Sequence, residues 1–127
     1  MPAKTPKEAH DLFVAYFNEG DLEKVISLYE PNATLVMMSE AVQGREAIRN
    51  AMGMFLSFKG HMELQVDRIF QTDDVDVLFS SWTLTGSDPQ DGSPRVTSGQ
   101  TSDVVRKQPD GNWLFVIDNP EGAASAK

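Results

Sequence analysis

The chain has 127 residues, 40% of them hydrophobic and 24% charged, with no cysteine and a formal net charge of -8. This length suits one domain with a single core, and the lack of cysteine excludes disulfides and thiolate metal sites. The acidity and the scattered lysines and arginines argue against a nucleic-acid or membrane partner, because phosphate binding needs clustered cations. With no signal peptide or bilayer-length apolar run in the sequence, we expect a cytoplasmic protein.

A first helix is predicted after Thr5, which can act as the N-cap ahead of Pro6 and Glu8. Gly20 ends this helix, since glycine readily adopts the left-handed conformation of a C-cap. Between these signals the apolar residues recur at helical spacing, which indicates one buried face. They are Ala9, Leu12, Phe13, Tyr16 and Phe17.

Two further helices are predicted on either side of a short strand. Asp21 caps the second helix, whose apolar face extends to Tyr29 before Pro31 breaks it. Residues 33–38 form a short apolar strand, and a polar link follows. A third helix begins at Gly44.

Period-two patterns typical of strands occupy the rest of the chain. We expect strands at residues 62–70, 75–86, 96–107 and 113–118, with residues 121–127 as a frayed tail. Helices followed by an antiparallel meander predict a single α+β domain, with its core at about residues 6–120 and the helices on one sheet face.

The last two strands form a hairpin in which Asp103 lies opposite Asp118 if the loop has an even number of residues. Two facing carboxylates are destabilising on an ordinary surface, so they are candidates for a functional pair. Strict alternation puts Val105 and Val116 on the face of these acids. The other face carries Val104, Trp113, Phe115 and Ile117. Because the helices can cover only one sheet face, we expect a homodimer through the face with Trp113, Phe115 and Ile117.

Several short motifs, in this order and spacing, resemble the nuclear transport factor 2-like superfamily and its SnoaL-like, ketosteroid isomerase-like branch. The motifs are Asn18-Glu19-Gly20-Asp21-Leu22, Tyr29-Glu30-Pro31-Asn32-Ala33-Thr34, Gly44-Arg45-Glu46-Ala47-Ile48, Asp110-Gly111-Asn112-Trp113 and Ile117-Asp118-Asn119-Pro120. The resemblance implies a cone-shaped barrel, with about three N-terminal helices in the concave face of a curved, mainly antiparallel sheet. It also implies an apolar pocket, commonly in a dimer. Members include isomerases, cyclases, dehydratases, epoxide hydrolases and binding domains, so the fold does not settle the function.

Ketosteroid isomerases place a carboxylate base where this chain has Met37, and an oxyanion tyrosine where it has Phe13, with Tyr16 one turn later. Their protonated aspartate falls on Asp103. The Asp-Arg-Asp set of limonene epoxide hydrolase-like members would need an arginine where this chain has Thr101. Neither mechanism is complete here.

The candidate catalytic residues are therefore Asp103 and Asp118, because burial and mutual repulsion would leave them a shared proton. The predicted pocket-lining residues are Phe13, Tyr16, Phe17, Met37, Phe55, Phe79, Ser81, Thr101 and Val116, although core packing also explains them. The two histidines, His10 and His61, lack a second ligand at metal spacing, so neither a metal nor a cofactor is expected.

Two functions stay open. One is binding of a small, mostly apolar molecule with cofactor-independent acid–base chemistry of the isomerase, cyclase or hydrolase type. The other is a non-catalytic ligand-binding or dimerisation module.

Overall fold

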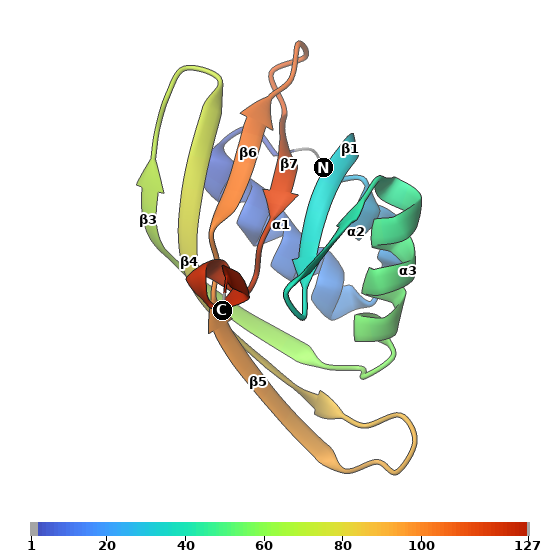
Figure 1. Cartoon of the computed structure of the whole chain (residues 1–127). Helices are drawn as coiled ribbons and strands as arrows, with labels where there is room; N and C mark the ends of the chain where they lie inside the picture. The colour runs from blue at the N-terminus through green and yellow to red at the C-terminus, as the bar shows by residue number, and fades with distance from the viewer. Residues whose placement is uncertain (1–2, 127) are drawn as a thin grey trace.

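The computed structural model describes residues 3–126, in which three helices pack against one curved, mostly antiparallel sheet of an α+β fold (Figure 1). The sheet curls into an open cone around the helices. The helices are α1 (Pro6–Glu19), α2 (Leu22–Ile26) and α3 (Arg45–Leu56). The strands are β1 (Tyr29–Met37), β2 (Glu40–Gln43), β3 (His61–Phe70), β4 (Val75–Ser87), β5 (Pro94–Gln100), β6 (Asp103–Lys107) and β7 (Trp113–Asp118).

The helix signals read from the sequence at Thr5, Gly20 and Asp21 are confirmed. The Thr5 hydroxyl accepts the Glu8 N–H, and Gly20 ends α1 with φ of 75°. Asp21 caps α2 through the Lys24 N–H. Local side-chain and backbone chemistry therefore fixes both ends of α1 and the start of α2.

The second helix is shorter than predicted. It ends at Ile26, and Tyr29 begins β1 instead of completing a helical face. β1 runs through Pro31 because its parallel pairing with β7 shifts register between Tyr29 and Thr34, where the ladder does not need a proline N–H. The predicted polar link contains the edge strand β2, paired with β1.

One predicted strand, residues 96–107, is two strands in the structure. The ladder breaks at Thr101 and Ser102, whose N–H groups donate to the carbonyls of Ser80 and Asn119. β6 pairs with the first part of β4 and β5 with its second part. Figure 1 shows β5 and the end of β4 extending as an arm beyond the helices.

A bulge in β7 changes which residues face the helices. Val105 pairs with Phe115, but the next pair is Val104 with Ile117, so β7 carries one extra residue. Phe115 and Asp118 therefore both point into the interior, with exposed fractions of 1% and 6%. The predicted partner-facing set was wrong for Trp113 and Phe115, which are core residues, and right only in placing Ile117 outside.

The C-terminal residues, expected from the sequence to be a frayed tail, have a defined conformation although most of them are not buried. Residues Gly122–Ala126 form a short 3-10 helix, η1, and Gly122 is buried. This helix is the red coil at the C mark of Figure 1, against the ends of β6 and β7. Lys127 of the predicted tail lies outside the described residues.

None of the helices within residues 3–126 combines the length and the apolar character that crossing a membrane requires.

Candidate functional site

Five buried polar side chains from five different elements meet between α1 and the sheet. They are His10 of α1, Tyr29 of β1, Ser80 of β4, Asp103 of β6 and Asp118 of β7, here called the acid cluster. None is more than 6% exposed. Polar groups buried to this degree need hydrogen-bond partners, and these groups find them among themselves and the neighbouring backbone.

Asp103 is the centre of one branch of the acid cluster. Its Oδ2 lies 2.6 Å from His10 Nε2, and its Oδ1 accepts the Asn119 N–H at 2.7 Å. On the far side of the imidazole, His10 Nδ1 lies 2.8 Å from Ser80 Oγ. The branch is therefore a continuous chain from a backbone amide through a carboxyl and an imidazole to a hydroxyl.

Asp118 forms the second branch. The Tyr29 hydroxyl donates to Asp118 Oδ2 at 2.5 Å, and Asp118 is hydrogen-bonded to Asp103 as well. Burial, the charge of Asp118 and this hydrogen bond raise the pKa of Tyr29, which keeps its proton. The predicted pairing of the two acids is thus present, and the two carboxyls share protons with each other and with a phenol.

The protonation of the acid cluster follows from its burial. Burial raises the pKa of Asp103 to about 7, although the Asn119 N–H opposes this. Burial and the neighbouring Asp103 raise the pKa of Asp118 well above its usual range. Burial also lowers the pKa of His10 to about 4. The contact between His10 and Asp103 is accordingly a hydrogen bond between groups that burial favours in their neutral forms, and not an ion pair of fixed charges.

Phe115 positions the two rings of the acid cluster. Its ring stacks on the His10 imidazole with centroids 5.5 Å apart and lies 5.5 Å from the Tyr29 ring. Phe13 of α1 contacts the Phe115 ring edge-on. The bulge in β7 is what allows Phe115 to pack here while Asp118 also points inward.

Most of the predicted pocket residues lie in the core or beside the acid cluster. Phe13, Tyr16 and Phe17 are buried core residues of α1, and Met37 and Phe55 pack against that core while partly buried. Thr101 is buried beside the acid cluster, where its hydroxyl accepts the Ser80 N–H at 3.1 Å.

Phe79 and Ser81 do not face the interior as predicted. They alternate with Leu78 and Ser80 along β4, which point toward the helices, so they lie on the outer face of the sheet. The Phe79 ring meets Phe70 edge-on, and Ser81 donates to Asp67. Val116, also predicted to line the pocket, sits at the bulge.

Sequence reasoning missed His10, Tyr29 and Ser80 as members of the site. His10 lies three residues before Phe13, so its place on the apolar face of α1 was a usable signal. Tyr29 was assigned to a helix, and Ser80 falls within an unremarkable run of strand residues.

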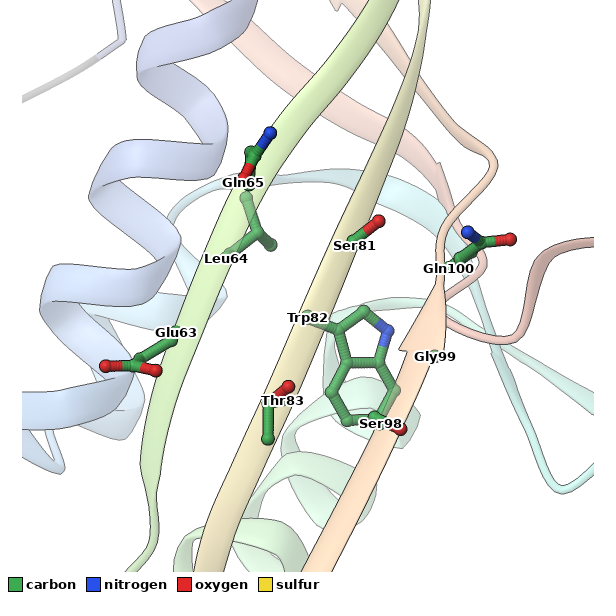
Figure 2. A pocket seen from close by; sticks show the side chains of 9 residues that line it. All are labelled: Glu63, Leu64, Gln65, Ser81, Trp82, Thr83, Ser98, Gly99 and Gln100. Carbon is green, nitrogen blue, oxygen red and sulfur yellow. The ribbon is translucent and has the colours of Figure 1, made fainter.

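The hollows that the structure outlines among residues 3–126 include one on another face of the sheet. The outer groove, of about 590 Å³, runs along β3, β4 and β5 (Figure 2). By the pairing of these strands, its polar side chains share the face turned away from the helices. They are Glu63, Gln65, Ser81, Thr83, Ser98 and Gln100.

A second hollow of about 380 Å³ is lined by Ala3, Tyr16, Lys24, Ser27, Leu28, Gln108, Asp110, Asn112 and Leu114. No residue of the acid cluster lines either hollow. We take the acid cluster as the candidate site, because it combines buried, convergent polar groups with shifted pKa values. Across residues 3–126, no three His, Asp or Glu side chains are placed to hold a metal ion.

Comparison with known proteins gives a consistent family and fold. A family model described as SnoaL-like domain matches residues 11–116. No curated protein sequence matches the chain.

Three similar solved structures illustrate the fold. A ketosteroid isomerase-like protein from Erwinia carotovora atroseptica has a TM-score of 0.79 and 19% identity, covering 88% of each chain. A nuclear transport factor 2-like superfamily protein from Salmonella enterica serovar Typhimurium has a TM-score of 0.78 and 20% identity, covering 91% of this chain and 86% of that one. A protein from Xanthomonas campestris, assigned as a calcium/calmodulin dependent protein kinase II association domain, has a TM-score of 0.73 and 26% identity. That match covers 89% of this chain and 81% of that chain.

Proposed function

The chain belongs to the SnoaL-like domain family of the nuclear transport factor 2-like superfamily, and on this basis we propose that it binds a small, mostly apolar molecule and moves a proton on it without a cofactor. The observation that carries the proposal is the acid cluster, in which two buried carboxyls share protons with a histidine and a tyrosine. Such a cluster suits an isomerase, cyclase or hydrolase type of acid–base reaction.

Asp103 is the residue that exchanges a proton with the bound molecule. Its pKa of about 7 lets it act either as an acid or as a base near neutral pH. Asp118, whose pKa burial also raises, orients the Asp103 carboxyl, while Tyr29 orients Asp118. His10 and Ser80 hold the other side of Asp103 and carry its proton away from the reacting centre.

This assignment differs from the arrangement in ketosteroid isomerases. Met37 stands where their base would be, and Phe13 has no hydroxyl to act as an oxyanion donor. The proton transfer is therefore assigned to the Asp103–Asp118 pair alone, and steroid isomerisation is not the proposed reaction.

The proposal is tested with 2-tetralone, a small enolisable ketone, as the probe. Wild-type protein in D2O should exchange the protons next to the carbonyl faster than Asp103→Asn does, as measured by proton NMR. Asp67→Asn, which removes a carboxylate on the outer face, is the matched control and should exchange like the wild type. Equal exchange by the wild type and Asp103→Asn, with no shift of the Asp103 carboxyl carbon on adding the ketone, would overturn the proposal.

A second candidate function, a non-catalytic ligand-binding or association module, is favoured by a different observation. Every buried side-chain nitrogen and oxygen among the described residues already has a partner, so the acid cluster is satisfied without a ligand. One similar structure is assigned as an association domain. Binding of 2-tetralone without enhanced proton exchange, or association without binding, would favour this candidate.

We also propose a homodimer through the outer face of the sheet, with Ile117 but without Trp113 and Phe115. Exposed apolar side chains on this face, Phe70 at 50% and Ile117 at 39%, would be covered by a second copy. Sedimentation at micromolar concentration should give twice the chain mass of 14.0 kDa, and Ile117→Lys should return it to a monomer. A wild-type monomer would discard the dimer.

A further inference from the structure

The first residue after β7 hydrogen-bonds the buried carboxyl group of Asp103. The Asn119 N–H donates to Asp103 Oδ1 at 2.7 Å, and the Asn119 carbonyl accepts the Ser102 N–H at 2.9 Å. Residues 119–126, here called the C-terminal strap, therefore continue from Asp118 past the start of β6, where their first residue contacts the acid cluster.

Two glycines allow the C-terminal strap to lie close against β5. A Cβ at Gly122, whose φ is +55°, would stand 2.5 Å from the Gln100 carbonyl. A Cβ at Gly99 would stand 3.0 Å from the Pro120 carbonyl, which also accepts the Trp82 indole N–H at 2.8 Å. Only residues without side chains permit this approach, so the strap is fitted to its place.

Glu121 ties the C-terminal strap to the turn that follows β1, the strand next to β7 in the sheet. Its two carboxylate oxygens accept the N–H groups of Met38 and Ser39 at 2.7 and 2.8 Å. These two residues form the tight turn between β1 and β2, and both have left-handed backbones, with φ of 52° and 64°. Successive backbone N–H groups turned outward in this way bind a carboxylate well, and the bound charge offsets the strain of the turn.

Little else holds the distal part of the C-terminal strap. Ala123 and Ala124 are exposed, and the strap buries no large apolar side chain. The Glu121 contacts are themselves at the surface, where water competes for them. A segment held by a few polar contacts opens at a lower free energy than the core on which it lies.

We propose that residues 119–126 form a lid over the acid cluster. The Glu121 carboxylate holds the lid closed by binding the Met38–Ser39 turn, and molecules reach Asp103 and Asp118 when it opens. Closed, the lid leaves the two acids 2% and 6% exposed. Open, it uncovers them from the end of β6 and β7, without disturbing the helices or the rest of the sheet. That the entering molecule is a substrate rests on the proposed function, but the lid itself does not.

The test measures how fast a water-soluble carbodiimide and glycine ethyl ester modify each carboxyl group, read by mass spectrometry of peptides. Glu121→Ala removes the latch, and Glu40→Ala, an exposed glutamate on the adjacent strand, is the matched control. We expect Asp103 and Asp118 to be modified about tenfold faster in Glu121→Ala than in Glu40→Ala, which corresponds to about 1.4 kcal/mol.

Asp76 distinguishes lid opening from general unfolding. It is a buried carboxyl on β4, 2% exposed, and it binds the Thr72 N–H away from the C-terminal strap. Its modification rate should stay unchanged in Glu121→Ala. Equal acceleration of Asp76, Asp103 and Asp118, or no acceleration at all, would overturn the lid.

The labelling needs no substrate, so its outcome separates the two proposals. Selective labelling without proton exchange on 2-tetralone keeps the lid and removes the catalytic function. Exchange by the wild type without selective labelling in Glu121→Ala does the reverse.

Discussion

Ser80 and Ser81 are consecutive residues of β4, and each hydrogen-bonds a side chain of another element. Ser80 meets His10 in the acid cluster at 2.8 Å, whereas Ser81 donates to Asp67 beside the outer groove at 2.5 Å. The two contacts are similar in length and opposite in setting. Ser80 is 1% exposed, and Ser81 lies on the open face of the sheet.

The comparison shows that the accessible groove and the groups with shifted pKa values lie in different parts of the molecule. The outer groove is hollow and open to water. The acid cluster is closed, and burial shifts the pKa values of Asp103, Asp118 and His10. A search for hollows alone would select the groove, whereas the buried, converging hydrogen bonds and the shifted pKa values point to the acid cluster.

The largest contrast is expected between two phenylalanines on opposite faces of the sheet. Phe115→Ala removes the ring that contacts His10, Phe13 and Tyr29, and should cost about 3–5 kcal/mol of unfolding free energy. Phe79→Ala, on the outer face beside Phe70, should cost less than half as much. Urea denaturation measures both, and equal losses would contradict the placement of Phe115 in the core.

The second prediction concerns pH. Burial raises the pKa of Asp118, so the folded chain keeps a proton that the unfolded chain releases above pH about 3.9. The contribution of Asp118 to the free energy of unfolding is therefore fully present below that pH and is lost as the pH rises. Asp103 acts in the same direction up to its pKa of about 7. His10 acts in the opposite direction between pH about 6.5 and about 4, because its lowered pKa reduces stability as the pH falls. The effects of Asp103 and His10 therefore largely offset each other.

Asp118→Asn should therefore remove part of the fall in stability that accompanies a rise in pH above about 3.9. Urea denaturation across this range measures it, with Asp67→Asn on the outer face as the control. A slope that is the same in Asp118→Asn and the wild type would show that Asp118 is not a buried, proton-holding group.

A smaller effect is expected for Tyr29→Phe. The change keeps the ring against Phe115 but leaves Asp118 Oδ2 without its donor, at a cost of about 1–3 kcal/mol. It should also raise the Asp118 pKa further, since the hydrogen bond from Tyr29 opposes the effect of burial. Carbon-detected NMR titration of the carboxyl groups measures this shift, and an unchanged Asp118 titration would contradict the contact.

The smallest contrast uses the two serines themselves. Ser80→Ala leaves His10 Nδ1 without its buried partner and should cost about 1 kcal/mol. Ser81→Ala, on the outer face, should stay within about 0.5 kcal/mol of the wild type. Equal effects in thermal denaturation would mean that burial does not distinguish the two sites.

Much of this organisation could be predicted from the sequence, because its causes are local. Thr5, Gly20 and Asp21 mark helix ends through contacts within a few residues, and alternation placed Asp103 and Asp118 on the same face. The fold class followed from the order of helices and strands and from the family resemblance.

What failed depended on distant partners. No local signal marks the bulge at Val116, which arises from pairing with β6 and sends Phe115 inward. Tyr29 fitted a helical spacing, but its pairing with β7, more than eighty residues away, makes it a strand residue. His10 and Ser80 can be recognised as site residues only from their contacts with each other and with Asp103.

The parallel pairing of β1 with β7 also has a consequence for how the chain folds. β7 pairs with β1 and β6, its first residue Trp113 donates to the Ala3 carbonyl, and Asn119 behind it anchors the C-terminal strap. Contacts between segments so far apart in sequence close late and slow the folding rate. A ribosome that has not yet released residues 113–126 carries a chain whose β1 and β6 edges are both unpaired. The acid cluster thus assembles only once residues 113–119 are free to pair with β1 and β6, in the step that closes the sheet.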